Sequence, residues 1–150
     1  MAKLEVKIRE IAEADLPLIY NSWLKSYRES PAVRSIPNSI YFKEHHKLIE
    51  NILMSTYCQV LVACAADDEN VVYGYLVIEF LDSPVVHWAY CKQQFRRSGV
   101  MKALVAEARS GEATADISNL QYSHFTRFAS KLLGGFDVDA VYNPYAGKLG

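Results

Sequence analysis

Residues 85–108 have the sequence VVHWAYCKQQFRRSGVMKALVAEA, and this stretch decides how the rest of the chain is interpreted. Its first seven residues are mostly β-branched or aromatic, which is typical of a strand. After Gly99, apolar residues at positions 100, 101, 104, 105 and 108 follow the spacing of one helix face. The stretch therefore predicts a strand, a short basic loop and a helix in direct succession.

The loop between this strand and helix predicts an anion site. The first backbone N–H groups of a helix lack partners within the helix, and the helix dipole places partial positive charge there. Arg96 and Arg97 add two permanent charges that suit phosphate, just before Ser98 and Gly99. A solvated loop would have a similar composition, but the strand and helix on either side favour the phosphate site.

Composition indicates one globular domain spanning residues 1–150. Apolar residues make up 51% of the chain and charged residues 22%, which argues against disorder. The net charge of −1 gives no general attraction to nucleic acid, so a nucleic-acid partner is not expected. No apolar run is long enough to span a bilayer, and the N-terminal residues alternate charged with apolar side chains. We therefore expect a cytoplasmic protein without a membrane segment, with Cys58, Cys64 and Cys91 as reduced thiols.

Hydrophobic periodicity predicts the remaining elements. A strand with alternating apolar residues opens the chain, and a helix starting near residue 13 follows. Ser39 is expected to cap a second helix that ends near Ser55, with Phe42, His45 and Ile49 on its apolar face. The later elements are strands over residues 59–65 and 71–80, the stretch above, a strand over 119–123, a helix over 126–133 and a strand over 136–142.

This order predicts an α/β fold built on a central mixed sheet. An antiparallel meander followed by a strand–helix–strand crossover gives a sheet of about six to seven strands with helices on both faces. Gly74, inside the long strand 71–80, is expected to mark a bulge. The last strand lies at an edge, where it could pair with a second copy of the chain.

The stretch from Arg96 to Met101, RRSGVM, resembles the Q/R-x-x-G-x-G/A signature of the GNAT acetyltransferase superfamily. The flanking strand and helix, the opening segment IREIAEADLPLIYNSW and the order of the elements are also similar to that family. Met101 departs from the pattern, because the family prefers Gly or Ala there. The resemblance implies a GNAT-like fold, and small divergent members of this kind are also encoded by phages.

The resemblance further implies acetyl-CoA as cosubstrate. In the family the loop binds the pyrophosphate through main-chain amides, and two splayed parallel strands hold the pantetheine and acetyl groups. These strands would here be residues 85–91 and 119–122. The residues that would contact the cosubstrate are Tyr90, Cys91, Arg96, Arg97, Ser98, Gly99, Val100 and Met101.

The catalytic groups are left open among several candidates. An acceptor amine must lose a proton, and Glu79 at the end of the hairpin strand is a candidate base. The family often uses a Tyr of its last helix as general acid, but Phe128 is the only aromatic residue of that helix here. Tyr122 and His124 lie close by in sequence and are weak candidates, whereas His87 is interpreted as structural or as lining the acceptor cleft. No metal site is expected, because the adjacent residues His45 and His46 point about 100° apart on a helix.

Two functions of different classes are compatible with these patterns. The first is an acyl-CoA-dependent N-acyltransferase, most simply transferring acetyl by direct attack of an unknown amine. The second is a GNAT-like scaffold without catalysis that binds another protein, in the manner of a phage accessory or effector protein. Met101 and the absence of a Tyr from the last helix motivate this second hypothesis. Modification of RNA or DNA is disfavoured, because the sequence has no basic stripe.

Overall fold

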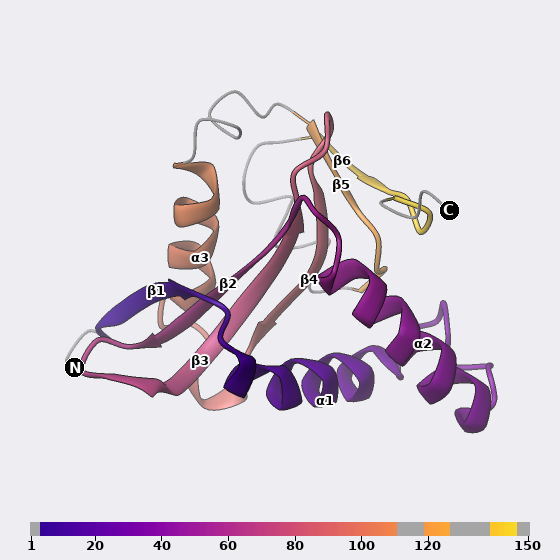
Figure 1. The fold of residues 1–150 in the computed structure, drawn as a ribbon, viewed down its shortest axis with the longest axis horizontal. Helices are drawn as coiled ribbons and strands as arrows, with labels where there is room; N and C mark the ends of the chain where they lie inside the picture. The colour runs from indigo at the N-terminus through magenta and orange to yellow at the C-terminus, as the bar shows by residue number, and fades with distance from the viewer. Residues whose placement is uncertain (1–3, 111–118, 127–138, 147–150) are drawn as a thin grey trace.

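The computed structural model describes residues 4–110, 119–126 and 139–146, which form one six-stranded sheet and its covering helices (Figure 1). The strands lie in the sheet in the order in which they occur in the chain. They are β1 (Val6–Glu10), β2 (Cys58–Ala65), β3 (Asp68–Glu79), β4 (Val85–Cys91), β5 (Asn119–Tyr122) and β6 (Asp139–Tyr142). The helices are the short η1 (Glu13–Asp15) and η2 (Gln93–Phe95) and the longer α1 (Leu16–Tyr27), α2 (Asn38–Leu53) and α3 (Val100–Arg109).

The sheet is mixed, as the sequence predicts. β1 to β4 form an antiparallel meander, whereas β5 is parallel to β4 and β6 is parallel to β5. The change to parallel pairing follows the crossover through α3, because a parallel neighbour cannot be reached by a tight turn. The predicted helix over residues 126–133 lies outside the described residues, except for Thr126, and so do residues 136–138 of the last predicted strand.

The β2–β3 hairpin is longer than expected, and it contains the predicted bulge. Its turn is confined to residues 66–67, so β3 begins at Asp68, three residues before the expected strand over residues 71–80. Ala63 pairs with Gly74 whereas Cys64 pairs with Val72, so one extra residue of β3 lies directly beside Gly74. Asp67, Asp68 and Glu69 at the tip of this hairpin are exposed, whereas Glu79 at the far end of β3 is buried.

Two expectations for α2 are wrong. The helix begins at Asn38, because the carbonyl oxygen of Pro37 already accepts bonds from the amides of Ile40 and Tyr41, and no side chain caps it. Ser39 therefore lies inside the first turn. Tyr41 is the buried aromatic residue, at 2% exposure, whereas Phe42 is 39% exposed. Adjacent helical residues point about 100° apart, and Tyr41 is the one that packs in the apolar cluster that also contains the buried Ile49.

The helices cover both faces of the sheet and bury a separate apolar cluster on each. The α1 and α2 side holds residues such as Trp23, Ile49 and Trp88, and the α3 side holds residues such as Leu76, Val100 and Leu104. Figure 1 shows α3 on one side of the sheet and α1 and α2 on the other. None of the helices among the described residues is long and apolar enough to cross a membrane.

Candidate functional site

The loop that leads into α3 is shaped by two residues in the left-handed backbone region. Arg97 has φ 66° and Gly99, the residue before the helix, has φ 85°. The first helical hydrogen bond runs from the amide of Ala103 to the carbonyl of Gly99. The amides of the first turn of α3 are therefore left for another acceptor, as expected at a helix N-terminus.

A cavity of about 350 Å³ lies against this loop and the first turn of α3. Residues that line it include Cys91, Arg96, Arg97, Gly99, Met101 and Lys102. Met101 is half-buried and packs partly on the α3-side cluster, so its side chain leaves this hollow open. Val100 is 1% exposed and can offer only its backbone amide, and the half-buried Ser98 stands between the two left-handed residues.

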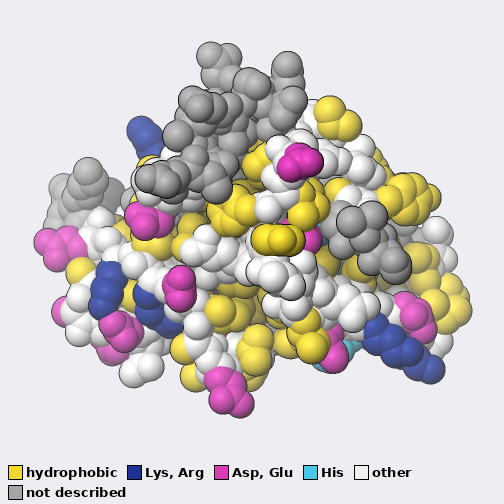
Figure 2. Space-filling model, turned by 45° about the horizontal axis from the view of Figure 1, so that its top comes forward, with side chains coloured by type: hydrophobic (Ala, Val, Ile, Leu, Met, Phe, Trp, Pro, Cys, Tyr) yellow, Lys and Arg dark blue, Asp and Glu magenta, His cyan; other side chains and the backbone are white. Residues whose placement is uncertain are grey.

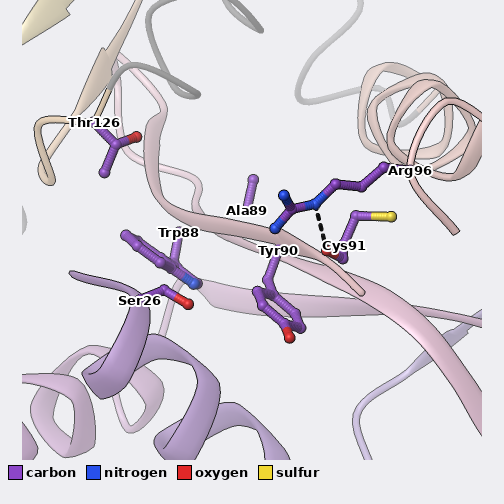
Figure 3. Close-up of a pocket in the computed structure, with 7 residues that line it drawn as sticks. All are labelled: Ser26, Trp88, Ala89, Tyr90, Cys91, Arg96 and Thr126. Carbon is purple, nitrogen blue, oxygen red and sulfur yellow. Dashed lines mark hydrogen bonds between the residues drawn. The ribbon is translucent and has the colours of Figure 1, made fainter. Parts of the chain in front are cut away.

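A second cavity of about 150 Å³ lies along the free part of β4 (Figure 3). β5 pairs with β4 only at Val85 and Val86, so the two strands diverge beyond these positions. The cavity is lined by Ser26 of α1, by Thr126 and by Trp88, Ala89, Tyr90 and Cys91 of β4, together with Arg96. No residue of β5 lines this cavity, so the expected gap between residues 85–91 and 119–122 stays a prediction.

The two cavities share Cys91 and Arg96 as lining residues and therefore lie next to each other. The Nε of Arg96 donates a hydrogen bond to the carbonyl oxygen of Cys91 at 3.2 Å, drawn as the dashed line in Figure 3. Burial raises the pKa of the Cys91 thiol, which favours its neutral form and a packing role over a nucleophilic one.

A chain of buried polar side chains fills the point where β4 and β5 diverge. Nε2 of His87 lies 2.8 Å from Oε1 of Glu79, and its Nδ1 lies 2.7 Å from Oγ of Ser123. The same Oγ lies 2.8 Å from Nδ1 of His124, and Nε2 of His124 lies 2.9 Å from Nε2 of His45. Four of these five side chains are almost fully buried, and His45 on α2 is half-buried.

A bulge in β4 places His87 in this chain. Val77 pairs with Trp88 whereas Ile78 pairs with Val86, so His87 is an extra residue. As a result, Val86 packs on the α3 side and Trp88 on the α1 side, although residues two apart on a regular strand share a face. The bulge therefore interrupts the regular alternation of sides along β4 at His87.

The structure brings two of the three catalytic candidates into one network. Glu79 and His124 are connected through His87 and Ser123, whereas Tyr122 packs on the α3-side cluster with its ring 5.6 Å from that of Tyr142. Sequence patterns missed the roles of His45, His87 and Ser123, because these residues come from three separate segments.

The titratable groups around the network are held in their neutral forms. Burial, helped by the nearby Glu79, raises the pKa of the Cys58 thiol to about 12. Burial also raises the pKa of the phenols of Tyr27 and Tyr41, whose rings pack against His45. Among the described residues, no group of His, Cys, Asp and Glu side chains has the arrangement of a metal site.

Charged side chains on the described surface are dispersed. Figure 2 shows Lys and Arg at separate places near the margins of one face, with hydrophobic and acidic side chains between them. This face offers no continuous basic surface to a nucleic-acid backbone, in line with the composition of the chain.

Comparisons with solved structures identify the fold. A protein from Pyrococcus furiosus named as an acetyl transferase is similar over 91% of this chain and 94% of its own, with TM-score 0.68 and 18% identity. A Clostridium acetobutylicum protein named as an acetyltransferase and solved with acetyl-CoA covers 88% of each chain, with TM-score 0.62 and 14% identity. A GNAT-family acetyltransferase from Staphylococcus aureus Mu50 is similar over 87% of this chain and 79% of its own, with TM-score 0.58 and 14% identity.

The chain therefore has the GNAT acetyltransferase fold, and the resemblance seen in the sequence is confirmed at the level of the fold. No family model matches the sequence, and no curated protein matches it by sequence. Because the structural neighbours share so little sequence identity, their activities enter only as support for a proposal.

Proposed function

We propose that this chain is an N-acetyltransferase that uses acetyl-CoA and an amine acceptor. The observation that carries the proposal is that the two cavities are adjacent and share Cys91 and Arg96 as lining residues. One cavity offers helix N-terminal amides and basic side chains for phosphates, and the other offers the open edge of β4. This combination suits a ligand with an anionic head and a long neutral arm.

The loop cavity fits the pyrophosphate of acetyl-CoA. Arg97 and Lys102 are exposed beside the free amides of the first turn of α3, so charge and hydrogen-bond donors converge on one place. Met101 is compatible with this role because the hollow persists beside it. The solved neighbour from Clostridium acetobutylicum, which contains acetyl-CoA, supports the same ligand.

The β4 cavity fits the pantetheine arm and the acetyl group. The main chain from Trp88 to Cys91 pairs with β3 along one edge, and its other edge borders the cavity without a partner strand among the described residues. Main-chain groups of Tyr90 and Cys91 would bind the arm and polarise the thioester carbonyl. In the reaction the amine nitrogen bonds to the acetyl carbon, the carbon–sulfur bond breaks, and coenzyme A leaves as a thiol after gaining a proton. Glu79 and His124 belong to the buried polar network, in which the ring of His124 lies 5.9 Å from that of Trp88, and we propose that they act on the proton that the amine must lose.

Calorimetric titration with acetyl-CoA tests the proposal. We expect binding at about micromolar affinity, weakened about tenfold or more by Arg97→Glu, since a charge reversal replaces attraction by repulsion at the phosphates. Arg34→Glu is the matched control, because Arg34 is exposed on the distant loop between α1 and α2. Dephospho-CoA separates binding of the pyrophosphate from binding of the ribose phosphate.

Absence of binding at millimolar acetyl-CoA would contradict the proposed function. If binding occurs, a panel of primary amines, assayed by release of the coenzyme A thiol, identifies the class of acceptor.

A further inference from the structure

We propose that His45, His124, Ser123, His87 and Glu79 form a side-chain proton relay that takes the proton lost by the acceptor amine. This inference rests on the proposed function, which requires that proton to leave. Its evidence is separate: four consecutive hydrogen bonds of 2.7 to 2.9 Å that connect α2, the end of β5, β4 and β3.

The hydrogen bonds admit a single direction when Glu79 is ionised. A carboxylate only accepts, so Nε2–H of His87 donates to Glu79, and Nδ1 of neutral His87 must accept from the Ser123 hydroxyl. Ser123 then accepts from Nδ1–H of His124, whose Nε2 accepts from Nε2–H of His45. Every donor in the chain thus points toward Glu79, whose other oxygen accepts from Ser55 at 2.7 Å.

Adding one proton reverses the direction of every hydrogen bond in the relay. A proton that arrives at Nδ1 of His45 releases the proton on its Nε2 to His124, and each following group passes one proton on. The last proton comes to lie between Oε1 of Glu79 and Nε2 of His87. The two states differ by one proton and need no movement of any ring, because each link only exchanges its donor and acceptor. Proton loss by the amine is therefore balanced by proton gain at Glu79.

The relay is placed beside the proposed acetyl cavity. The amide of Ser123 donates to the carbonyl of Val86, the last position at which β4 pairs with β5. The ring of His124 lies 5.9 Å from that of Trp88, and Trp88 lines the β4 cavity. The ring of Tyr27 packs against both Trp88 and His45, with centroids 5.7 and 5.2 Å away, so the half-buried entry of the relay at His45 lies behind this wall of the cavity.

The other titratable groups that face the relay do not change charge near neutral pH. Tyr27 of α1 and Tyr41 of α2 have a raised pKa, as does Cys58 of β2, so all three stay neutral below about pH 9. The guanidinium of Arg28, which lies over the Tyr41 ring, stays charged. His46 faces away from the relay and stacks on Tyr20. A titration between about pH 5 and 9 in this region therefore reports the relay itself.

The first experiment measures the ring nitrogens of the histidines by ¹⁵N NMR as a function of pH in the native protein. A relay predicts that His45, His87 and His124 change together with one midpoint, since one proton reverses all of them. It also predicts opposite tautomers for His45 and His124 on either side of that midpoint. Three independent midpoints would overturn the proposal.

Variants of Ser123 test whether the histidines communicate through its hydroxyl. Ser123→Ala removes the hydroxyl that bonds to both His87 and His124, so the shared midpoint should split into two. Ser123→Thr keeps a hydroxyl and should restore one midpoint. Ser22→Ala is the control, because Ser22 is also buried and hydrogen-bonded but to Tyr75, outside the relay. A midpoint that stays shared in Ser123→Ala would contradict the relay.

The kinetic experiment uses Glu79→Gln. Glutamine can accept from His87 and donate to Ser55, so the fold and the hydrogen bonds are kept while the final proton acceptor is lost. We expect acetyl-CoA affinity to be unchanged, kcat to fall about 100-fold and the acidic limb of the kcat–pH profile to disappear. An unchanged kcat and pH profile would overturn the catalytic assignment of the relay. Failure of acetyl-CoA to bind the native protein would instead overturn the proposed function. The NMR titration tests the relay independently, because it needs no acetyl-CoA.

Discussion

Gly74 lies so close to the carbonyl oxygen of Tyr90 that a β-carbon at Gly74 would be 2.4 Å from that oxygen. The contact is between backbone atoms of β3 and β4, so it cannot be relieved by turning a side chain. Gly74→Ala should therefore push the two strands apart and reduce the free energy of unfolding by about 1 to 3 kcal/mol in urea denaturation. Because Gly74 pairs with Cys91, which lines both cavities, acetyl-CoA affinity should fall as well.

Gly99→Ala is the comparison, because a β-carbon at Gly99 meets no atom within 4 Å. Gly99→Ala should lower the free energy of unfolding by about 1 to 2 kcal/mol, and only because alanine is strained at φ 85°. Gly99→Asn should cost less, since Asn tolerates this region. If Gly74→Ala were as stable as the native chain, the close approach of the two strands would be refuted.

Arg97→Gly should separate the backbone role of Arg97 from its charge. Arg97 has φ 66°, which glycine adopts without penalty, so the variant should be about 1 kcal/mol more stable than the native chain. Acetyl-CoA binding should nevertheless weaken, because a charge beside the phosphates is lost. Thermal unfolding and calorimetry on the same sample measure the two effects. Arg34→Gly, at a position without a positive φ, should gain no stability.

Trp88 and Trp23 should report ligand binding by fluorescence. They are the two tryptophans of the chain, stacked with ring centroids 5.7 Å apart, but only Trp88 lines the β4 cavity. We expect acetyl-CoA to change the tryptophan emission of the native protein and of Trp23→Phe. The change should be mostly lost in Trp88→Phe. An equal response of the two variants would place the ligand elsewhere.

Asp15 should make stability depend on pH through its pair with Arg9. Nη1 and Nη2 of Arg9 donate to the two oxygens of Asp15 at 2.7 and 2.9 Å, and the amide of Ala12 donates to the same carboxylate. The Arg9 guanidinium holds the pKa of Asp15 below its usual value. A lowered pKa means that the stabilisation is complete above the unfolded-state pKa of about 3.9 and is lost as the pH falls through the folded-state pKa.

Asp15→Asn should therefore lower the free energy of unfolding by about 1.5 to 3 kcal/mol at pH 7. This difference in stability from the native chain should shrink on acidification below about pH 4. Urea denaturation at several pH values measures it. Asp67→Asn, at the exposed hairpin turn, serves as the control. A difference that stays constant down to low pH would argue against the ion pair.

The sequence predicts the elements well where periodicity is strong. The strand over residues 85–91 and the start of α3 agree with the structure, because apolar alternation and helix spacing both change at the basic loop. The aromatic residue that α2 buries is predicted wrongly, since Tyr41 and Phe42 are adjacent and the more polar Tyr41 is buried with its hydroxyl donating to the carbonyl of Leu24. Sequence pattern gives the apolar face only to within one residue.

The candidate site is predicted only in part. The phosphate loop is local in sequence, so its residues could be identified together. The polar network is not local: His45, His87 and Ser123 are far apart along the chain, and they meet only through the fold. The bulge that aims His87 inward adds one residue to β4, and composition carries no signal for such an insertion.

The short pairing of β4 with β5 has a consequence for local opening of the molecule. Only two residue pairs connect them, whereas β2 and β3 are paired along almost their entire length. Separation of β5 and β6 from the rest of the sheet should thus require less free energy than global unfolding, and amide hydrogens of β5 should exchange with solvent sooner than those of β2. A ligand that spans the gap would connect the two parts of the sheet and slow that exchange. With substrate bound, β5 and β6 would therefore unfold together with the rest of the sheet and not before it.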